Sequence, residues 1–150
     1  MREIIIILPL IFGFLFGQLG KPDEWYNKLR KTRLNPPKII FPIAWTILYL
    51  LIGISYYLII NKLNLKKENG LMILMIVHLI INYSYTPLLF YFRQIFISAI
   101  ICLITLILAI VLFKEFWKID KSGIASYLLI PYIIWLIFAN YLAWSLYYLN

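Results

Sequence analysis

Charged residues and cysteine are scarce in this sequence. Only 13% of the 150 residues are charged, whereas 64% are hydrophobic and the mean hydropathy is +0.90. A soluble domain is about one quarter charged and about half apolar, so this composition excludes a water-soluble globular protein. The single cysteine, Cys102, excludes an intramolecular disulfide and a cysteine-based metal site, and no metal is expected.

Ionisable groups are also scarce in the apolar stretches. Between Glu68 and Arg93 they are limited to His78 and tyrosines, and between Arg93 and Lys114 to Cys102. An ion pump needs buried charges to bind and relay ions, and a selective channel needs rings of charges or carbonyl groups. The sequence therefore disfavours both classes of protein.

The fourteen basic residues outnumber the six acidic ones. They occur in short runs between apolar stretches rather than as one stripe, so no nucleic-acid partner is expected. Such runs are typical of anchors beside anionic lipid headgroups, which indicates the lipid bilayer as the surrounding of the protein.

Five apolar stretches approach the length of about twenty helical residues that crosses a bilayer. We predict an all-α membrane protein that forms a compact bundle of five transmembrane helices, as a single domain over residues 1–150. The predicted helices cover about 4–19, 38–60, 71–92, 94–113 and 123–149, with a first loop over 20–37. A signal peptide is an alternative interpretation of the first stretch, because Arg2 precedes it, but no A-x-A-like cleavage site follows.

The basic residues on the two sides of this predicted bundle are equal in number, seven on each. One side has Arg2, Lys62, Lys66, Lys67, Lys114, Lys118 and Lys121, and the other has Lys21, Lys28, Arg30, Lys31, Arg33, Lys38 and Arg93. Six members of the second set lie in or beside the first loop, which favours a cytoplasmic loop. We therefore expect a multi-pass protein of the cell membrane with its N-terminus outside and its C-terminus inside.

Aromatic residues make up 18% of the chain and recur with helical spacing. Residues three or four apart share one face of a helix, so three stripes of this kind can meet around one volume. The stripes are Phe41, Trp45, Tyr49 and Gly53, then His78, Asn82, Tyr85, Thr86 and Leu89, and finally Pro131, Trp135, Ala139 and Ala143.

Tryptophan also anchors proteins at membrane interfaces, which is the competing interpretation. Anchoring is favoured for Trp25, Trp117 and Trp144, which lie near the ends of segments. Trp45 and Trp135 lie well inside their segments and share a face with small or polar neighbours, so a pocket is favoured for this pair.

Two polar residues are expected deep in the third predicted helix. An unpaired Asn82 amide would be costly there, so we expect it to bond another helix, a ligand or both. His78, one turn earlier, is a possible haem ligand. Because the sequence identifies no facing His, Met or Cys, a neutral, hydrogen-bonded histidine is favoured.

Small residues at helical spacing predict close helix packing. They are the G-x-x-x-G pair Gly13 and Gly17, and a stripe in the fourth predicted helix formed by Ser98, Cys102, Thr105 and Ala109. These features favour a homodimer.

Residues 36–53, PPKIIFPIAWTILYLLIG, resemble the signature of the tryptophan-rich sensory protein / translocator protein family, TspO/MBR. Residues 82–88, NYSYTPL, and 131–142, PYIIWLIFANYL, resemble its third-helix and fifth-helix blocks. The resemblance covers essentially the whole chain, including its length and helix count.

This resemblance implies an apolar pocket, covered by the first loop, that binds porphyrins such as protoporphyrin IX or haem as ligands, in tetrapyrrole handling or stress sensing. No cofactor is required. The expected ligand-binding residues are Trp25, Tyr26, Trp45, Tyr49, His78, Asn82, Tyr85, Trp135 and Ala139. We further expect the loop bases to meet the porphyrin propionates, namely Lys28, Arg30, Lys31 and Arg33.

The family leaves other functions open. Some members are linked to light-dependent breakdown of protoporphyrin IX, which would make Trp45 and Trp135 catalytic, and a small-molecule transporter is a third possibility. The family also favours a homodimer. This sequence departs from the family at Tyr85, where tryptophan is common, and at His78, where an amide is common. No Arg or Lys follows Tyr141, so sterol recognition is not predicted.

Overall fold

The computed structural model describes residues 1–64 and 67–150, and the regular structure in this part of the chain is helical. Lys66, one of the basic residues counted above, lies outside the described residues. The elements are α1 (Ile4–Gly17), α2 (Glu24–Lys28), α3 (Ile40–Lys62), α4 (Asn69–Thr86), a π-helical turn η1 (Pro87–Tyr91), α5 (Ile95–Ile119), α6 (Ile124–Tyr127) and α7 (Ile130–Leu149).

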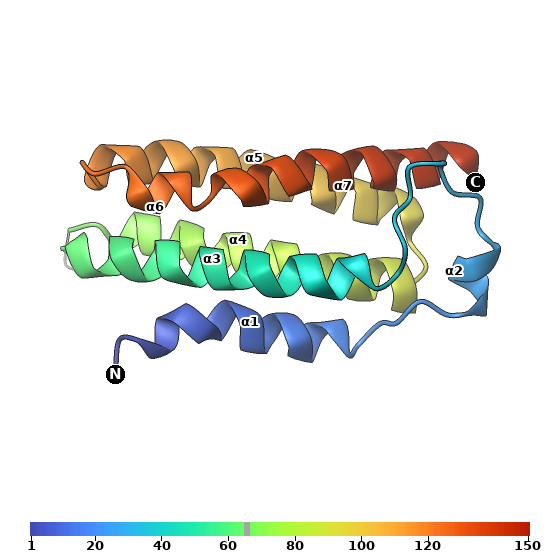
Figure 1. The fold of residues 1–150 in the computed structure, drawn as a ribbon, viewed down its shortest axis with the longest axis horizontal. Helices are drawn as coiled ribbons and strands as arrows, with labels where there is room; N and C mark the ends of the chain where they lie inside the picture. The colour runs from blue at the N-terminus through green and yellow to red at the C-terminus, as the bar shows by residue number, and fades with distance from the viewer. Residues whose placement is uncertain (65–66) are drawn as a thin grey trace.

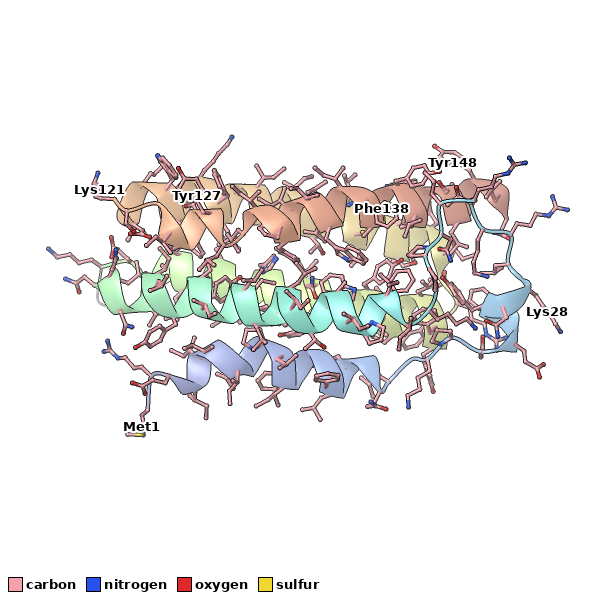
Figure 2. All side chains as sticks on the ribbon, viewed as in Figure 1. Met1, Lys28, Lys121, Tyr127, Phe138 and Tyr148 are labelled. Atoms are coloured by element: carbon pink, nitrogen blue, oxygen red, sulfur yellow. The ribbon has the colours of Figure 1, made fainter. Side chains whose placement is uncertain are left out.

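Among the described residues, four stretches are long and apolar enough to cross a membrane, namely Ile40–Lys62, Asn69–Tyr91, Ile95–Ile119 and Ile124–Leu149. α1 is also apolar but has only 14 residues. Large apolar side chains such as Ile73, Ile107 and Ile134 face outward, each more than half exposed. Lys28 and Lys121 lie at opposite ends of the molecule (Figure 2). The chain is therefore a membrane helical bundle.

The long helices lie side by side, with α1 on the side opposite α5 and α7 (Figure 1). Their contacts run in the order α1, α3, α7, α5, α4 and back to α1. The N-terminus, the end of α3, the start of α4 and the α5–α6 link lie at one end. The loop that contains α2, the α4–α5 turn and the C-terminus lie at the other end (Figure 1).

Two glycines allow α1 to approach α3 closely. A Cβ atom at Gly53 would collide with the backbone carbonyl of Ile6, and one at Gly13 would collide with the ring of Tyr49. Open space surrounds Gly17. One half of the predicted G-x-x-x-G pair thus packs within the chain, as small residues do between membrane helices.

The stripe of small residues predicted for close packing lies on α5 and is buried inside the single chain. Its members are Ser98, Cys102, Thr105 and Ala109, none more than 5% exposed. Because these residues and Gly13 already have partners within the chain, they no longer support a homodimer, and that state stays a prediction from the family resemblance.

Helix ends differ from the predicted ones at one polar stretch, which was read as a break, and at two prolines, which were read as lying inside helices. α5 continues to Ile119 instead of ending at 113. Its last turns accommodate charged residues, since Lys118 and Glu115 pair on the outer surface of the helix (2.6 Å). The third predicted helix changes to η1 at Pro87, which has no N–H to donate. The last predicted helix is two helices, α6 and α7, with a break just before Pro131.

The first loop and the α4–α5 turn are also defined. Asp23 caps the short helix α2 by accepting a hydrogen bond from the backbone N–H of Tyr26 (3.0 Å). Arg93 adopts the left-handed conformation (φ 56°) that reverses the chain between η1 and α5.

One end of the bundle is closed around Asp120, which lies between α5 and α6 and is 2% exposed. Its carboxylate accepts from the Ala125 N–H (2.9 Å) and the Ser122 hydroxyl (2.7 Å), and pairs with the Lys62 ammonium of α3 (2.5 Å). The Ala125 N–H, followed by Lys62 and Ser122, holds the pKa of Asp120 well below its ordinary value. Ser55 of α3 reinforces this end by donating to the Ala125 carbonyl (2.7 Å).

Replacing Asp120 with alanine should lower the free energy of unfolding by about 2–3 kcal/mol, because the buried Ala125 N–H loses its charged acceptor. Unfolding followed by circular dichroism in detergent at pH 7 measures this loss. The folded-state pKa is depressed, so the wild-type advantage is complete above the unfolded pKa of about 3.9 and declines as the pH falls below it.

Glu115→Ala is the control, because it breaks an ion pair on the outer surface of the neighbouring helix. It should change the free energy of unfolding by less than about 1 kcal/mol. Equal losses in the two variants would contradict the closing role given to Asp120.

Candidate functional site

The end of the bundle that faces α2 encloses a cavity of about 820 Å³. Its walls come from α1, α3, α4, α5 and α7, and the loop between α1 and α3 supplies residues at its mouth. Cavities of roughly 300–1,000 Å³, apolar with a few polar groups, are typical of sites for small molecules. This cavity is the candidate functional site.

Seven of the nine residues predicted to bind a ligand line this cavity. They are Tyr26, Trp45, Tyr49, Asn82, Tyr85, Trp135 and Ala139. The other two lie elsewhere. The ring of Trp25 is 5.4 Å from the Arg93 guanidinium, which joins the loop to the α4–α5 turn. His78 is fully buried deeper in the bundle, so for both residues a ligand contact stays a prediction.

Aromatic rings form two sides of the cavity. Trp45 and Tyr49, one turn apart on α3, lie with their ring centroids 5.2 Å apart. From α7, Trp135 meets Phe41 of α3 edge to face at 6.1 Å. These contacts fix the orientation of broad ring faces inside the bundle, where they can stack on a flat ligand.

A chain of hydrogen bonds runs from this aromatic wall into the closed half of the bundle. The Tyr49 hydroxyl donates to Asn82 Oδ1 (2.7 Å), and Asn82 Nδ2 donates to the Tyr132 hydroxyl (2.8 Å). Tyr132 also bonds His78 Nε2 (2.8 Å), and His78 Nδ1 bonds the Tyr56 hydroxyl (2.7 Å). The chain therefore joins α3, α4 and α7 across the interior.

One arrangement of protons satisfies every link of this chain. Tyr132 accepts from Asn82, so its own proton goes to Nε2 of His78. A neutral His78 then carries its proton on Nδ1 and donates to Tyr56, whose hydroxyl donates to the Met75 carbonyl (3.3 Å). Both nitrogens of His78 thus face tyrosine hydroxyls rather than the cavity. The proton of Tyr49 is also committed, so its oxygen can offer only an acceptor to a ligand.

The loop between α1 and α3 is fastened across the end of the bundle by side chains distant in sequence. Thr32 Oγ1 and the Tyr141 hydroxyl are 2.6 Å apart. The Asn150 side chain accepts from the Arg30 N–H (3.0 Å) and donates to its carbonyl (2.9 Å). Together with the ion pair between Asp23 and Arg93 (3.1 Å), these contacts hold the loop over the cavity mouth.

The cavity mouth carries lysines, but not the set predicted from the sequence. Of the four predicted bases only Lys31 lines the cavity, where it is joined by Lys21 and Lys38. Figure 2 shows Lys28 directed away from the bundle. Lys31 Nζ donates to the carbonyls of Tyr26 (2.6 Å) and Leu29 (3.1 Å). Burial, followed by the charge of Lys38, lowers the pKa of Lys31. A bound anion would relieve the repulsion between the two ammonium groups.

Sequence reasoning missed a group of lining residues on α5 and along α7. Cys102 and Thr105 were interpreted only as packing residues, yet both line the cavity, and Leu136, Leu142 and Leu146 complete its apolar wall. The signal was present in the small size of the α5 side chains, which leaves space beside Ala139 of α7.

Comparisons with known proteins show which family the chain resembles. The TspO/MBR family model matches residues 5–149. The chain is 29% identical to the tryptophan-rich protein TspO of Bacillus cereus, with 99% of this chain and 97% of the relative aligned. It is 30% identical to the TspO protein of Chlorobaculum tepidum (100% and 99% aligned) and 30% identical to the translocator protein of Sus scrofa (92% and 85%). Since the match extends over nearly the entire chain, this protein belongs to the TspO/MBR family.

Proposed function

We propose that this protein binds porphyrins such as protoporphyrin IX or haem in the cavity of about 820 Å³, in tetrapyrrole handling or stress sensing. The observation that carries this proposal is the division of the cavity into aromatic walls and a cationic mouth. A porphyrin has the matching division, because its macrocycle is flat and apolar while its propionate carboxylates lie together on one edge. The rings of Trp45 and Trp135 suit the macrocycle, and the lysines at the mouth suit the carboxylates.

We further infer that α1 is a fifth membrane-spanning helix. Its 14 residues rise about 21 Å in total, less than the hydrocarbon thickness of about 30 Å. However, α1 packs along α3 and leads from the N-terminal end of the bundle to the loop at the other end (Figure 1). A short span of this kind is accommodated by local thinning of the bilayer. The cell membrane, the cytoplasmic position of the loop and the homodimer stay predictions.

Filling the cavity should weaken porphyrin binding. Ala139→Phe places a ring in the cavity at a position where the small Ala139 side chain lines the wall beside Cys102, and we expect the affinity for protoporphyrin IX to fall at least about tenfold, or about 1.4 kcal/mol. Titration of the detergent-solubilised protein, followed by the absorbance of the porphyrin, measures the dissociation constant. Ile137→Phe is the matched control, because Ile137 lies on the same helix but is 57% exposed to the outside. Unchanged affinity in Ala139→Phe would place the ligand elsewhere.

The lysines at the mouth should account for recognition of the propionates. Replacing Lys21, Lys31 and Lys38 together with glutamine should lower the affinity for protoporphyrin IX by about tenfold or more at low salt, and should remove most of its salt dependence. Affinity for the dimethyl ester, which has no carboxylates, should change little.

The matched control for this triple variant removes the same charge from the same loop. Lys28, Arg30 and Arg33 do not line the cavity, so replacing them with glutamine should leave the porphyrin affinity nearly unchanged. If both triple variants lose affinity equally, only the net charge of the loop matters and the assigned contacts are wrong.

Light-dependent degradation of protoporphyrin IX is a second candidate function, favoured by the presence of Trp45 and Trp135 on the same cavity. If indole side chains exchange electrons with the excited porphyrin in the presence of oxygen, Trp135→Phe should abolish a distinct product under light while leaving affinity in the dark within about threefold, because the phenylalanine ring still packs on the macrocycle. Product analysis by mass spectrometry measures this. The same product from wild type and variant would indicate photochemistry of the bound porphyrin alone. Transport stays a prediction.

A further inference from the structure

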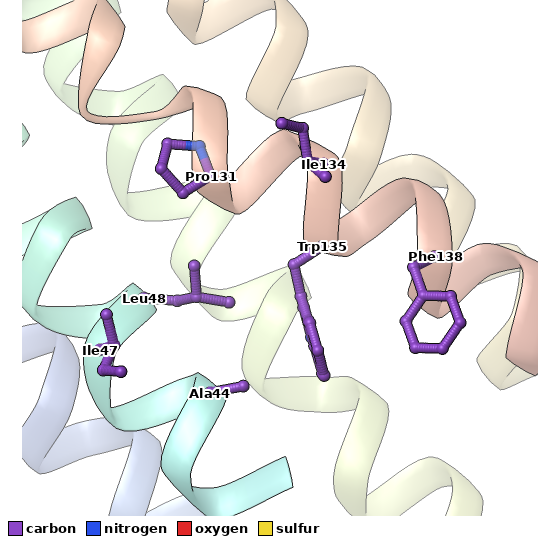
Figure 3. A pocket seen from close by; sticks show the side chains of 7 residues that line it. All are labelled: Ala44, Ile47, Leu48, Pro131, Ile134, Trp135 and Phe138. Carbon is purple, nitrogen blue, oxygen red and sulfur yellow. The ribbon is translucent and has the colours of Figure 1, made fainter. Parts of the chain in front are cut away.

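The outer surface of the bundle has a groove of about 370 Å³ between α3 and α7, distinct from the internal cavity. Its lining is apolar throughout and consists of Ala44, Ile47, Leu48, Pro131, Ile134, Trp135 and Phe138 (Figure 3). Ile47 is 55% exposed and Ile134 is 62% exposed, whereas Leu48 at the bottom is 5% exposed. In a membrane protein such a surface faces the lipid, so the groove is open to molecules dissolved in the bilayer.

Trp135 belongs to both the groove and the internal cavity. On the cavity side its ring meets Phe41 at 6.1 Å, and on the groove side it meets Phe138 at 5.7 Å. Figure 3 shows the indole extending from α7 towards α3, beside Ala44 and Leu48. The indole is therefore a partition between the lipid-facing groove and the cavity.

The partition is not held by a hydrogen bond. Trp135 Nε1 is buried and has no acceptor among the described residues. By contrast, Tyr49 and Asn82 on the opposite wall are fixed by the chain of hydrogen bonds. Rotation of the indole thus breaks only apolar contacts, which membrane lipid or an entering ligand can replace.

Among the described residues, the direct hydrogen bond between α3 and the segment of α6 and α7 lies at one end of the seam, whereas nearer the groove α3 and α7 are joined only indirectly, through Asn82 of α4. On the N-terminal side of Pro131, α6 is joined to α3 by the hydrogen bond from the Ser55 hydroxyl to the Ala125 carbonyl. At the groove the facing side chains on α3 include the small Ala44, and every lining side chain is apolar. The seam is therefore easiest to widen next to Trp135.

We propose that this groove is a lateral entry site, through which a flat apolar ligand dissolved in the bilayer passes edge first into the cavity when Trp135 turns aside. The alternative path, under the loop, is obstructed by the fastening of Thr32 and Asn150 and is lined by lysines. A macrocycle in the hydrocarbon core reaches an apolar groove without leaving its apolar surroundings. This inference rests on the proposed porphyrin-binding function.

Blocking the groove tests the proposal. Ile47→Trp and Ile134→Trp each place a bulky side chain in the groove without entering the cavity. With the protein in lipid nanodiscs and protoporphyrin IX supplied from lipid vesicles, stopped-flow measurement of porphyrin absorbance gives both rate constants. We expect association and dissociation to slow by about tenfold each, with the dissociation constant within about twofold of wild type.

Two lipid-facing positions outside the groove provide matched controls. Ile43 on α3 is 52% exposed and Ile137 on α7 is 57% exposed, close to the values for the two test positions. Ile43→Trp and Ile137→Trp should leave both rate constants unchanged. If the groove variants and the controls bind at the same rates as wild type, lateral entry is wrong. If Thr32→Val accelerates binding and the groove variants do not slow it, the ligand enters under the loop.

Equilibrium titration separates the two proposals. If wild-type protein shows no saturable binding of protoporphyrin IX, the proposed function and the entry site are both overturned. If the wild type binds and only the rate constants fail to respond, the entry site alone is overturned. Because the groove variants are expected to keep wild-type affinity, a folded protein with slow exchange is readily distinguished from one that has lost its cavity.

Discussion

The interior of this bundle depends on satisfying polar groups where no water is available. An unpaired amide or hydroxyl inside a membrane protein is costly, and the chain has several such groups at mid-depth. A chain of hydrogen bonds satisfies these groups, and it runs from Tyr49 through Asn82, Tyr132 and His78 to Tyr56. Each member donates its proton to the next. Because its members come from α3, α4 and α7, the same bonds fix the spacing of helices that face one another across the interior.

The interior of the bundle is filled at one end and hollow at the other. In the closed half, large side chains such as Tyr132, Phe116 and Met75 fill the interior and are at most 1% exposed. In the hollow half, the positions that would fill it on α5 and α7 hold Cys102 and Ala139, and the interior becomes the cavity. The cavity is therefore produced by a change of side-chain size along continuous helices, and it needs no separate domain.

The sequence predicted the membrane class and the family. It also predicted the aromatic part of the cavity wall, because helical periodicity places residues four apart on one face. Trp45 and Tyr49 are examples. It could not predict which loop bases reach the cavity, since Lys31 and Arg33 lie two residues apart in an irregular segment without the periodicity that would show which side chain faces inward. It also missed Tyr132, because a tyrosine in an apolar helix gives no sign of which partner its hydroxyl will find. The end of α5 was misjudged because the polar residues from Lys114 onward were read as a link, although Lys118 pairs with Glu115 on the surface of a continuous helix.

Trp135 is an exception to this pairing of buried polar groups, because its indole N–H has no hydrogen-bond acceptor among the described residues. Among the described residues, only its indole nitrogen and Asn140 Oδ1 are buried polar side-chain atoms without a partner. Asn140 is nevertheless held, because its amide group donates to the carbonyls of Cys102 (3.1 Å) and Leu136 (2.8 Å). Trp135 has no such bond, and an unsatisfied donor of this kind costs about 1–3 kcal/mol. Hydrogen bonds therefore keep the cavity wall formed by Tyr49 and Asn82 rigid, whereas the indole N–H of Trp135 has no acceptor among the described residues. The Trp135 side chain, which separates this wall from the lipid, can therefore move without breaking a hydrogen bond.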